Sequence, residues 1–89
     1  FTFIEAMIDG GVLAGLPRPL AEQLVLQTVY GSARLALETG EHPAVLKGRV
    51  TSPGGTTIAG LQVLEEGAFR GLVMNAVEAA TARSRELGA

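Results

Sequence analysis

Residues 19–38, PLAEQLVLQTVYGSARLALE, form the longest uninterrupted helical pattern in the chain. Pro19 suits the first turn of a helix, where its missing N–H is not needed. A helix that is apolar nearly all round is buried on several sides, so we predict that this helix packs against more than one neighbour. The apolar side chains that cover more than one of its faces are Leu20, Leu24, Leu26, Val29, Tyr30, Ala33, Leu35 and Leu37.

The chain is too small to hide this apolar content by itself. It has 89 residues, of which 47% are apolar and 18% are charged, and its mean hydropathy is +0.32. A domain of this length buries only about two thirds of the surface that its unfolded chain exposes. We therefore expect the excess along residues 19–38 and the neighbouring helices to be buried against the same helices of a second chain.

Composition argues against several classes of protein. The sequence lacks the run of about 20 apolar residues that a membrane-spanning helix needs, and we expect no membrane partner. A net charge of -2 and a pI of about 5.3 argue against nucleic-acid binding. The absence of cysteine excludes disulfides and thiolate metal sites and fits a cytosolic location. With His42 as the single histidine, we expect no metal site.

Glycine and proline divide the chain into five predicted helices. Apolar steps of three and four residues predict a first helix that ends near residue 14, and residues 15–17 stop it. The other predicted helices span residues 19–38, 43–49, 58–66 and 69–87, with Gly40 as the C-cap of the longest. No stretch has the alternating run of β-branched residues that would predict a strand. We predict an all-α fold, a single domain built as a bundle of about five helices.

The segment Ser52-Pro53-Gly54-Gly55-Thr56-Thr57 has residue types that suit the binding of an anion. We expect Ser52 to cap the following helix and Pro53 to lie in its first turn. Gly54 and Gly55 would then expose backbone N–H groups at the positive end of the helix dipole, where anions bind. Ser-Pro-Gly-Gly is also common loop chemistry. The residues alone leave a carboxylate cradle and an ordinary helix start as equal alternatives.

Other candidates for chemistry are weaker. His42 precedes a proline at a turn, so we interpret it as a solvent-facing or turn-stabilising residue. Tyr30 and the three phenylalanines fall on apolar stripes, which predicts core packing. The pair at residues 65–66 is most simply a solvated helix end.

The stretch of residues 50–61, VTSPGGTTIAGL, resembles the signature of the pyrroline-5-carboxylate reductase family. The resemblance implies an oxidoreductase that reduces Δ1-pyrroline-5-carboxylate to L-proline with NADPH or NADH, the last step of proline biosynthesis. It extends over essentially the whole chain, through Gly15-Leu16-Pro17, Glu41-His42-Pro43, Leu46-Lys47, Leu64-Glu65, residues 76–80 and Arg85-Glu86-Leu87.

The resemblance also implies how the parent enzyme is organised. Family members have an N-terminal Rossmann domain that binds the cofactor and an all-α C-terminal domain that interlocks two subunits, with further assembly in several members. Residues 1–89 resemble the C-terminal dimerisation domain alone, and the glycine-rich dinucleotide fingerprint is absent from the sequence. Because the chain begins at Phe1 as if in the middle of a helix, we expect it to be a fragment of a longer protein. Because the fingerprint is absent, we expect the fragment to bind no nicotinamide cofactor strongly and to be inactive alone.

Site roles carried over from the family fall on residues 52–57. The hydroxyl of Ser52 and the N–H groups of Gly55 and Thr56 would hold the substrate carboxylate, with Pro53 and Gly54 completing the loop. Thr57 is the expected catalytic residue, because its hydroxyl would hydrogen-bond the ring nitrogen. The proton itself comes from this hydroxyl, a water or an already protonated iminium. Some relatives have an acidic residue where this chain has Gly40, which puts a role for an acid in that turn in doubt.

Two other interpretations remain. The chain is alternatively a purely structural oligomerisation module from a Rossmann-linked dehydrogenase-type protein, or the helical domain of another such family. The hydroxyls of Ser52 and Thr57 around Gly55 favour the reductase, because a bare scaffold has no need of them at a helix start.

Overall fold

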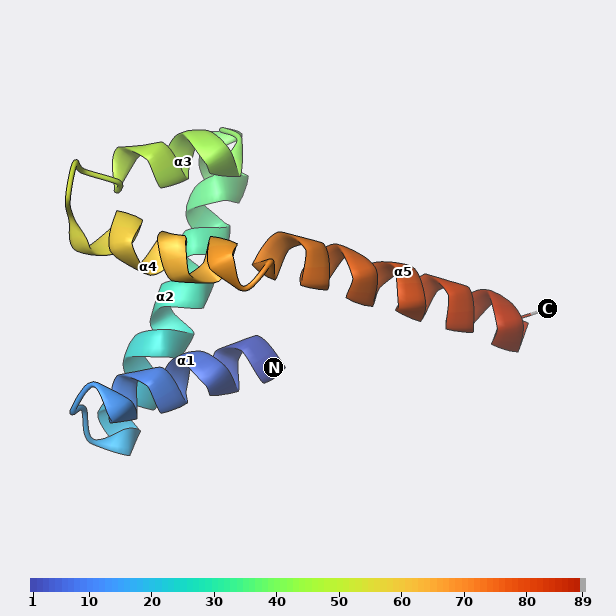
Figure 1. The fold of residues 1–89 in the computed structure, drawn as a ribbon, viewed down its shortest axis with the longest axis horizontal. Coiled ribbons are helices and arrows are strands. Elements are labelled where there is room, and N and C mark those ends of the chain that lie inside the picture. Colours follow the sequence, from blue (N-terminus) through green and yellow to red (C-terminus); the bar gives the residue numbers. More distant parts are fainter. Residues whose placement is uncertain (89) are drawn as a thin grey trace. The chain divides into compact units, whose positions relative to one another are not determined.

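The computed structural model describes residues 1–88, and all regular structure in this range is helical (Figure 1). The all-α, five-helix prediction is confirmed, and apart from the start of α4 the helix bounds agree with the predicted ones to within two residues. The residues group into two compact units, Phe1–Leu46 and the chain from Lys47 onward. The helices are α1 (Thr2–Leu13), α2 (Arg18–Thr39), α3 (Pro43–Arg49), α4 (Thr56–Glu66) and α5 (Phe69–Gly88).

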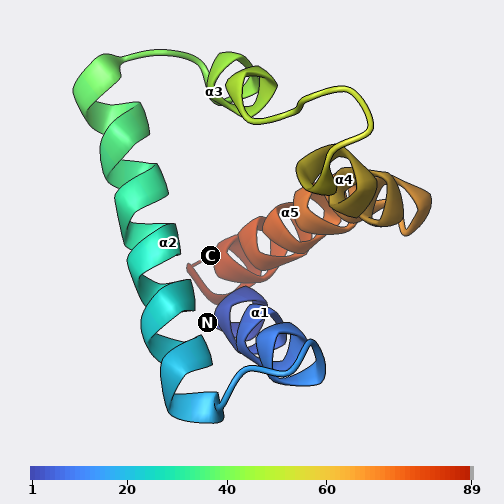
Figure 2. The ribbon, with the colours of Figure 1, turned by 90° about the vertical axis from the view of Figure 1, so that its left-hand side faces the viewer.

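Helices α1 and α2 form a hairpin in the first unit (Figure 2). Gly15 ends α1 with a φ of +112°, a value that residues other than glycine rarely adopt. The two helices approach closely at Gly11, where an added Cβ would lie 3.3 Å from the Cβ of Ala21. An exposed ion pair of 2.9 Å between Arg18 and Asp9 joins the start of α2 to α1. The small residues Gly11 and Ala21 therefore permit the close approach of the two helices.

Helix α2 keeps most of its apolar surface exposed in the single chain. Among the described residues, only Ala21 and Val25 are buried, at 0% and 8% relative exposure. These two residues face α1, whereas the other faces of α2 present large apolar side chains to solvent. The packing of α2 against more than one neighbour stays a prediction, because one chain leaves these apolar faces uncovered. The exposed residues are Leu20, Leu24, Leu26, Tyr30, Leu35 and Leu37.

The turn after α2 follows the predicted chemistry. Gly40 adopts a φ of +67° as the left-handed C-cap, and its N–H donates to the carbonyl of Ala36 at 3.0 Å. The Nδ1 atom of His42 accepts a hydrogen bond of 3.0 Å from the N–H of Ala44, which satisfies a donor at the start of α3. His42 is therefore a turn-stabilising residue, as expected.

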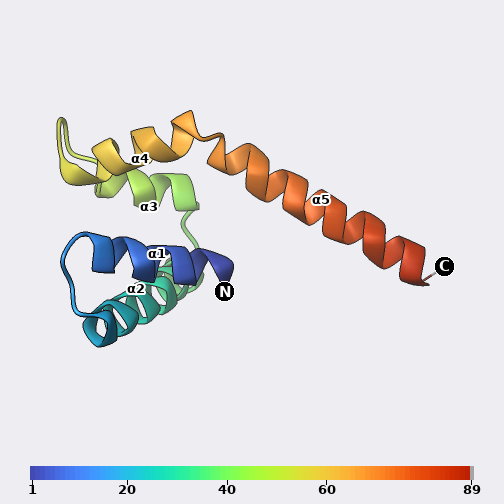
Figure 3. The same ribbon diagram turned by 60° about the horizontal axis from the view of Figure 1, so that its bottom comes forward.

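Helices α4 and α5 meet at a tight junction in the second unit (Figure 3). Ala68 has a φ of +56°, and its N–H donates to the carbonyl of Glu65 at 3.1 Å. The carboxylate of Glu65 also pairs with the guanidinium of Arg70 at 2.8 Å, which ties the first turn of α5 to the end of α4. Beyond this junction the apolar stripe of α5, including Leu72, Val73 and Val77, is exposed.

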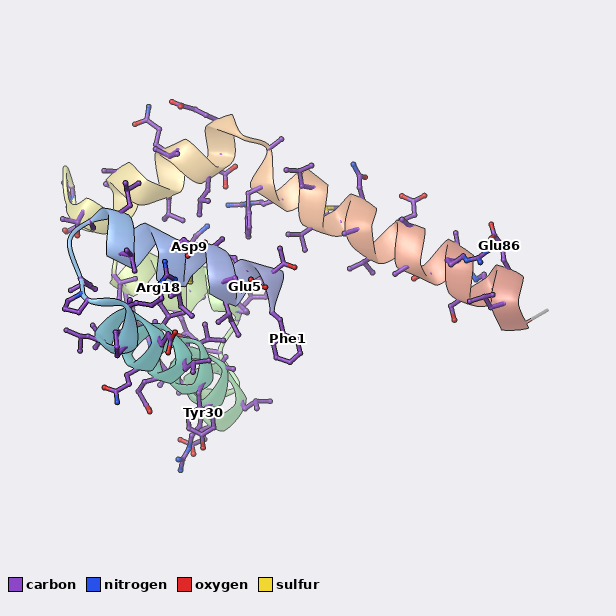
Figure 4. The ribbon with its side chains drawn as sticks, turned by 90° about the horizontal axis from the view of Figure 1, so that it is seen from below. Phe1, Glu5, Asp9, Arg18, Tyr30 and Glu86 are labelled. Atoms are coloured by element: carbon purple, nitrogen blue, oxygen red, sulfur yellow. The ribbon has the colours of Figure 1, made fainter. Side chains whose placement is uncertain are left out.

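The prediction that the aromatic residues pack in a core of this chain is wrong for three of four. Tyr30 is 60% exposed and points away from the ribbon, as does Phe1 (Figure 4). Phe3 is 49% exposed, and only Phe69 is half-buried. Their apolar spacing marks surfaces that this chain leaves uncovered. Of the helices in residues 1–88, none combines the length and apolar content that crossing a membrane requires.

Candidate functional site

Residues 52–55 form a tight turn before α4. The N–H of Gly55 donates to the carbonyl of Ser52 at 3.0 Å, which closes the turn. Pro53 occupies the second position, and Gly54 occupies the third with a φ of +68°. Proline followed by a residue of positive φ is the pattern of a type II turn. Glycine is therefore required at position 54 for its backbone conformation.

Gly55 is required for a different reason. Its φ of -80° and ψ of 179° are open to any residue. An added Cβ, however, would collide with the Oγ of Ser52 and lie 3.2 Å from the Ser52 carbonyl oxygen. The missing side chain at Gly55 thus lets the hydroxyl of Ser52 lie directly against the start of α4.

The predicted caps of this helix are wrong. Helix α4 begins at Thr56 with Gly55 as its N-cap, and no side chain caps it. Ser52 and Pro53 lie outside the helix because the turn uses both of them, and a chain that turns through Gly54 cannot be helical there. The sequence signals of a cap and of a proline turn are the same residue types, which is why the pattern was misassigned.

The start of α4 leaves backbone donors open. The first intrahelical bond of α4 joins the N–H of Ala59 to the carbonyl of Gly55 at 3.3 Å. The N–H groups of Thr56, Thr57 and Ile58 precede it and so have no acceptor within the helix. Together with the helix dipole, such groups attract an anion. The arrangement can hold a carboxylate.

The expected site residues lie together, with one difference in role. Ser52 and Thr56 are exposed, and Thr57 is half-buried in the first turn of α4. Of the two N–H groups expected to bind the carboxylate, that of Gly55 is directed to the carbonyl of Ser52, whereas that of Thr56 lies at the open helix end. The geometry adds the N–H groups of residues 57 and 58 to the candidate donors.

A cavity of about 670 Å³ borders the same turn within the second unit. The backbone of Gly54 and Gly55 forms part of its wall, and Lys47 and Thr51 contribute from the end of α3 and the residues after it. The hydroxyl of Thr51 donates to the carbonyl of Gly48 at 3.0 Å and so closes α3. The side chains of residues 52, 56 and 57 lie outside the lining.

Sequence reasoning missed Lys47 as a possible functional residue. It appeared only as part of a matching dipeptide, and nothing in its spacing set it apart from a solvated helical lysine. In residues 1–88 no three side chains of the metal-binding types gather as a metal site would need. The candidate chemistry is therefore that of hydroxyls, backbone N–H groups and one lysine.

Comparisons with known proteins agree on one family. The family model described as pyrroline-5-carboxylate reductase dimerisation matches residues 1–87. The pyrroline-5-carboxylate reductase of Synechocystis sp. is 64% identical over 85 residues, which cover 96% of this chain and 32% of that protein. The same enzyme of Arabidopsis thaliana is 63% identical over 87 residues, covering 98% and 32%.

Solved structures agree as well. The crystal structure of the Plasmodium falciparum pyrroline carboxylate reductase with NADP bound matches with a TM-score of 0.93 and 45% identity. The match covers 99% of this chain and 34% of that one. The chain thus spans about a third of the length of the relatives it matches.

Proposed function

The chain belongs to the pyrroline-5-carboxylate reductase dimerisation family, and from this premise we propose that it is the dimerisation and substrate-binding part of a proline-forming reductase. The parent enzyme converts Δ1-pyrroline-5-carboxylate to L-proline. Bound NADPH or NADH supplies the hydride that adds to the imine carbon, and one proton adds to the nitrogen. The cofactor is held mainly by a part of the parent that lies outside these 89 residues.

The open start of α4 carries this proposal. The substrate carboxylate binds at the positive helix end, where the N–H groups of Thr56 and its two successors face away from any intrahelical acceptor. The hydroxyl of Ser52 adds a donor from the turn, and Gly55 permits its close approach. Gly55 therefore supports the site by its missing side chain, while its own N–H maintains the turn.

Thr57 is the catalytic residue in this proposal. Its half-buried side chain belongs to the first turn of α4, one residue beyond Thr56. A hydroxyl at this place orients the imine nitrogen and stabilises the protonated ring as hydride arrives. Proton-transfer help of this kind is typically worth about 10²–10⁴-fold in rate. A Thr hydroxyl is a weak acid. In this proposal it therefore positions the proton, and a water or an already protonated iminium supplies it.

The uncovered apolar surface supports a homodimer as the working unit. Helix α2 exposes large apolar side chains on the faces that α1 does not cover, and α5 exposes another apolar stripe. At roughly 25 cal/mol per Å² of apolar area, covering these surfaces with a second copy favours association strongly. The proposal includes an interlocked dimer, its further assembly and a cytosolic location.

The proposed reaction is tested in the full-length parent enzyme. We expect NAD(P)H oxidation that depends on pyrroline-5-carboxylate and yields proline. Thr57→Ala should lower kcat by about 10²-fold, while equilibrium binding of NADPH stays unchanged. Thr81→Ala is the matched control, because Thr81 donates only to a carbonyl within α5.

Unchanged kcat and KM in Thr57→Ala would contradict the role of Thr57. A wild-type parent that forms no proline would contradict the proposed reaction and favour a purely structural module. The two failures are separate, because the second appears without any substitution.

A further inference from the structure

The cavity beside the glycine turn contains a cation that the proposed mechanism does not use. Lys47 lines this cavity from the last turn of α3. It is half-buried, whereas every arginine in residues 1–88 is exposed. Lys47 also has no ion-pair partner in the described chain. A lysine that lines a cavity and has no ion-pair partner favours the approach of an anion.

The charge of the cavity is not cancelled by its other lining residues. Arg70 and Glu65 both line it, and their ion pair of 2.8 Å makes them neutral together. Gln62 and Thr51 are polar but uncharged. Lys47 therefore leaves the cavity with one net positive charge.

The remaining walls suit a small organic molecule. Ile58 and Leu61 of α4 line the cavity with apolar side chains, and its volume of about 670 Å³ falls within the range of small-molecule sites. An apolar wall with one fixed charge is typical of such sites. A side chain at Gly54 would project into open space, so the edge between the cavity and the substrate loop is uncovered.

We propose that Lys47 binds the anionic group, a carboxylate or a phosphate, of a small molecule that occupies this cavity. The inference rests on the proposed function, because that function names the two molecules that could carry the anionic group. One is the substrate carboxylate, held beside the glycine turn that forms part of the cavity wall. The other is a phosphate of the nicotinamide cofactor. Both are recognised by the same chemistry, a charge-assisted hydrogen bond from the ammonium group.

The test uses three variants of the full-length enzyme. Lys47→Met removes the charge and keeps the apolar stem, and Lys47→Arg keeps the charge. Arg83→Met is the matched control, because it removes a cation that lies outside the cavity and pairs with Glu86. The measurements are KM for pyrroline-5-carboxylate and the dissociation constant of NADP⁺, each at two salt concentrations.

We expect Lys47→Met to raise one of the two constants about tenfold, the loss typical of a hydrogen bond to a charged group. Lys47→Arg should restore that constant to within about twofold, and Arg83→Met should leave it unchanged. The constant that responds identifies the source of the anion. Its salt dependence should also weaken in Lys47→Met, because salt screens the charge that this variant lacks.

Several results would overturn the assignment. One such result is that Lys47→Met leaves both constants within about twofold of the wild-type values. Another is that Lys47→Arg binds the ligand as weakly as Lys47→Met does. A shifted monomer–dimer equilibrium with both constants unchanged would make the cavity a subunit contact. If the wild-type enzyme forms no proline, the proposed reaction fails by itself. Calorimetry with NADP⁺ and with L-proline then tests Lys47 directly, and equal affinities in wild type and Lys47→Met would refute it.

Discussion

The two units of this chain are both helical but present different features. The unit of residues 1–46 is a helix hairpin whose apolar side chains mostly face solvent, and its polar contacts are local. The unit from Lys47 onward contains the glycine turn, the open start of α4 and the cavity. In the proposed function the ligand chemistry depends on the glycine turn, whereas association depends on the apolar faces of α2 and α5, so we expect substitutions at the turn and on α2 to disturb one without the other.

The largest expected effect comes from a charge on the exposed apolar face of α2. Leu24→Asp should weaken dimerisation by at least about 100-fold, because an unpaired carboxylate in an apolar interface costs several kcal/mol. Gln27→Asp is the control, since it places the same carboxylate at a polar, exposed position of the same helix. Sedimentation equilibrium measures both dissociation constants. Equal dimerisation of Leu24→Asp and wild type would remove α2 from the interface.

A substitution in the second unit should affect chemistry and leave association intact. Gly55→Ala forces the hydroxyl of Ser52 away from the start of α4, and we expect kcat/KM of the full-length enzyme to fall about tenfold. In a Ser52→Ala background the same change should cost much less, because the colliding Oγ is gone. A double-mutant cycle on kcat/KM measures this coupling. Additive effects would show that Gly55 does not act through Ser52.

The smallest expected effect lies at the turn before α3. His42→Ala removes the acceptor for the N–H of Ala44 and should lower the free energy of unfolding by about 1 kcal/mol, as the loss of a helix cap does. His42→Asn should retain most of the wild-type free energy of unfolding, because asparagine also caps helices. Chemical denaturation of the isolated chain measures both. A His42→Ala variant as stable as wild type would mean that this hydrogen bond contributes nothing.

The sequence predicted the helices well and the site less completely. Glycine and proline end helices through their backbone conformation. The local sequence at Gly15 and Gly40 was therefore enough to predict where α1 and α2 end. Ser52 and Pro53 were misassigned to a helix cap because turns and caps share residue types. The position of Lys47 beside the glycine turn depends on how the end of α3 and the start of α4 border one cavity, and periodicity does not report that.

Apolar spacing also did not indicate which surface covers a side chain. Tyr30 and Phe3 lie on stripes that pattern alone assigns to a core, yet both are exposed here. The same pattern fits a core within one chain and an interface between two chains, because burial in either removes the same apolar area from water.

The most direct test of the central claim is the mass of the isolated 89-residue chain in solution. Light scattering at micromolar concentration should give twice the chain mass of 9.2 kDa, because we propose that a second copy covers the apolar faces of α2. A mass of 9.2 kDa at that concentration would contradict the account.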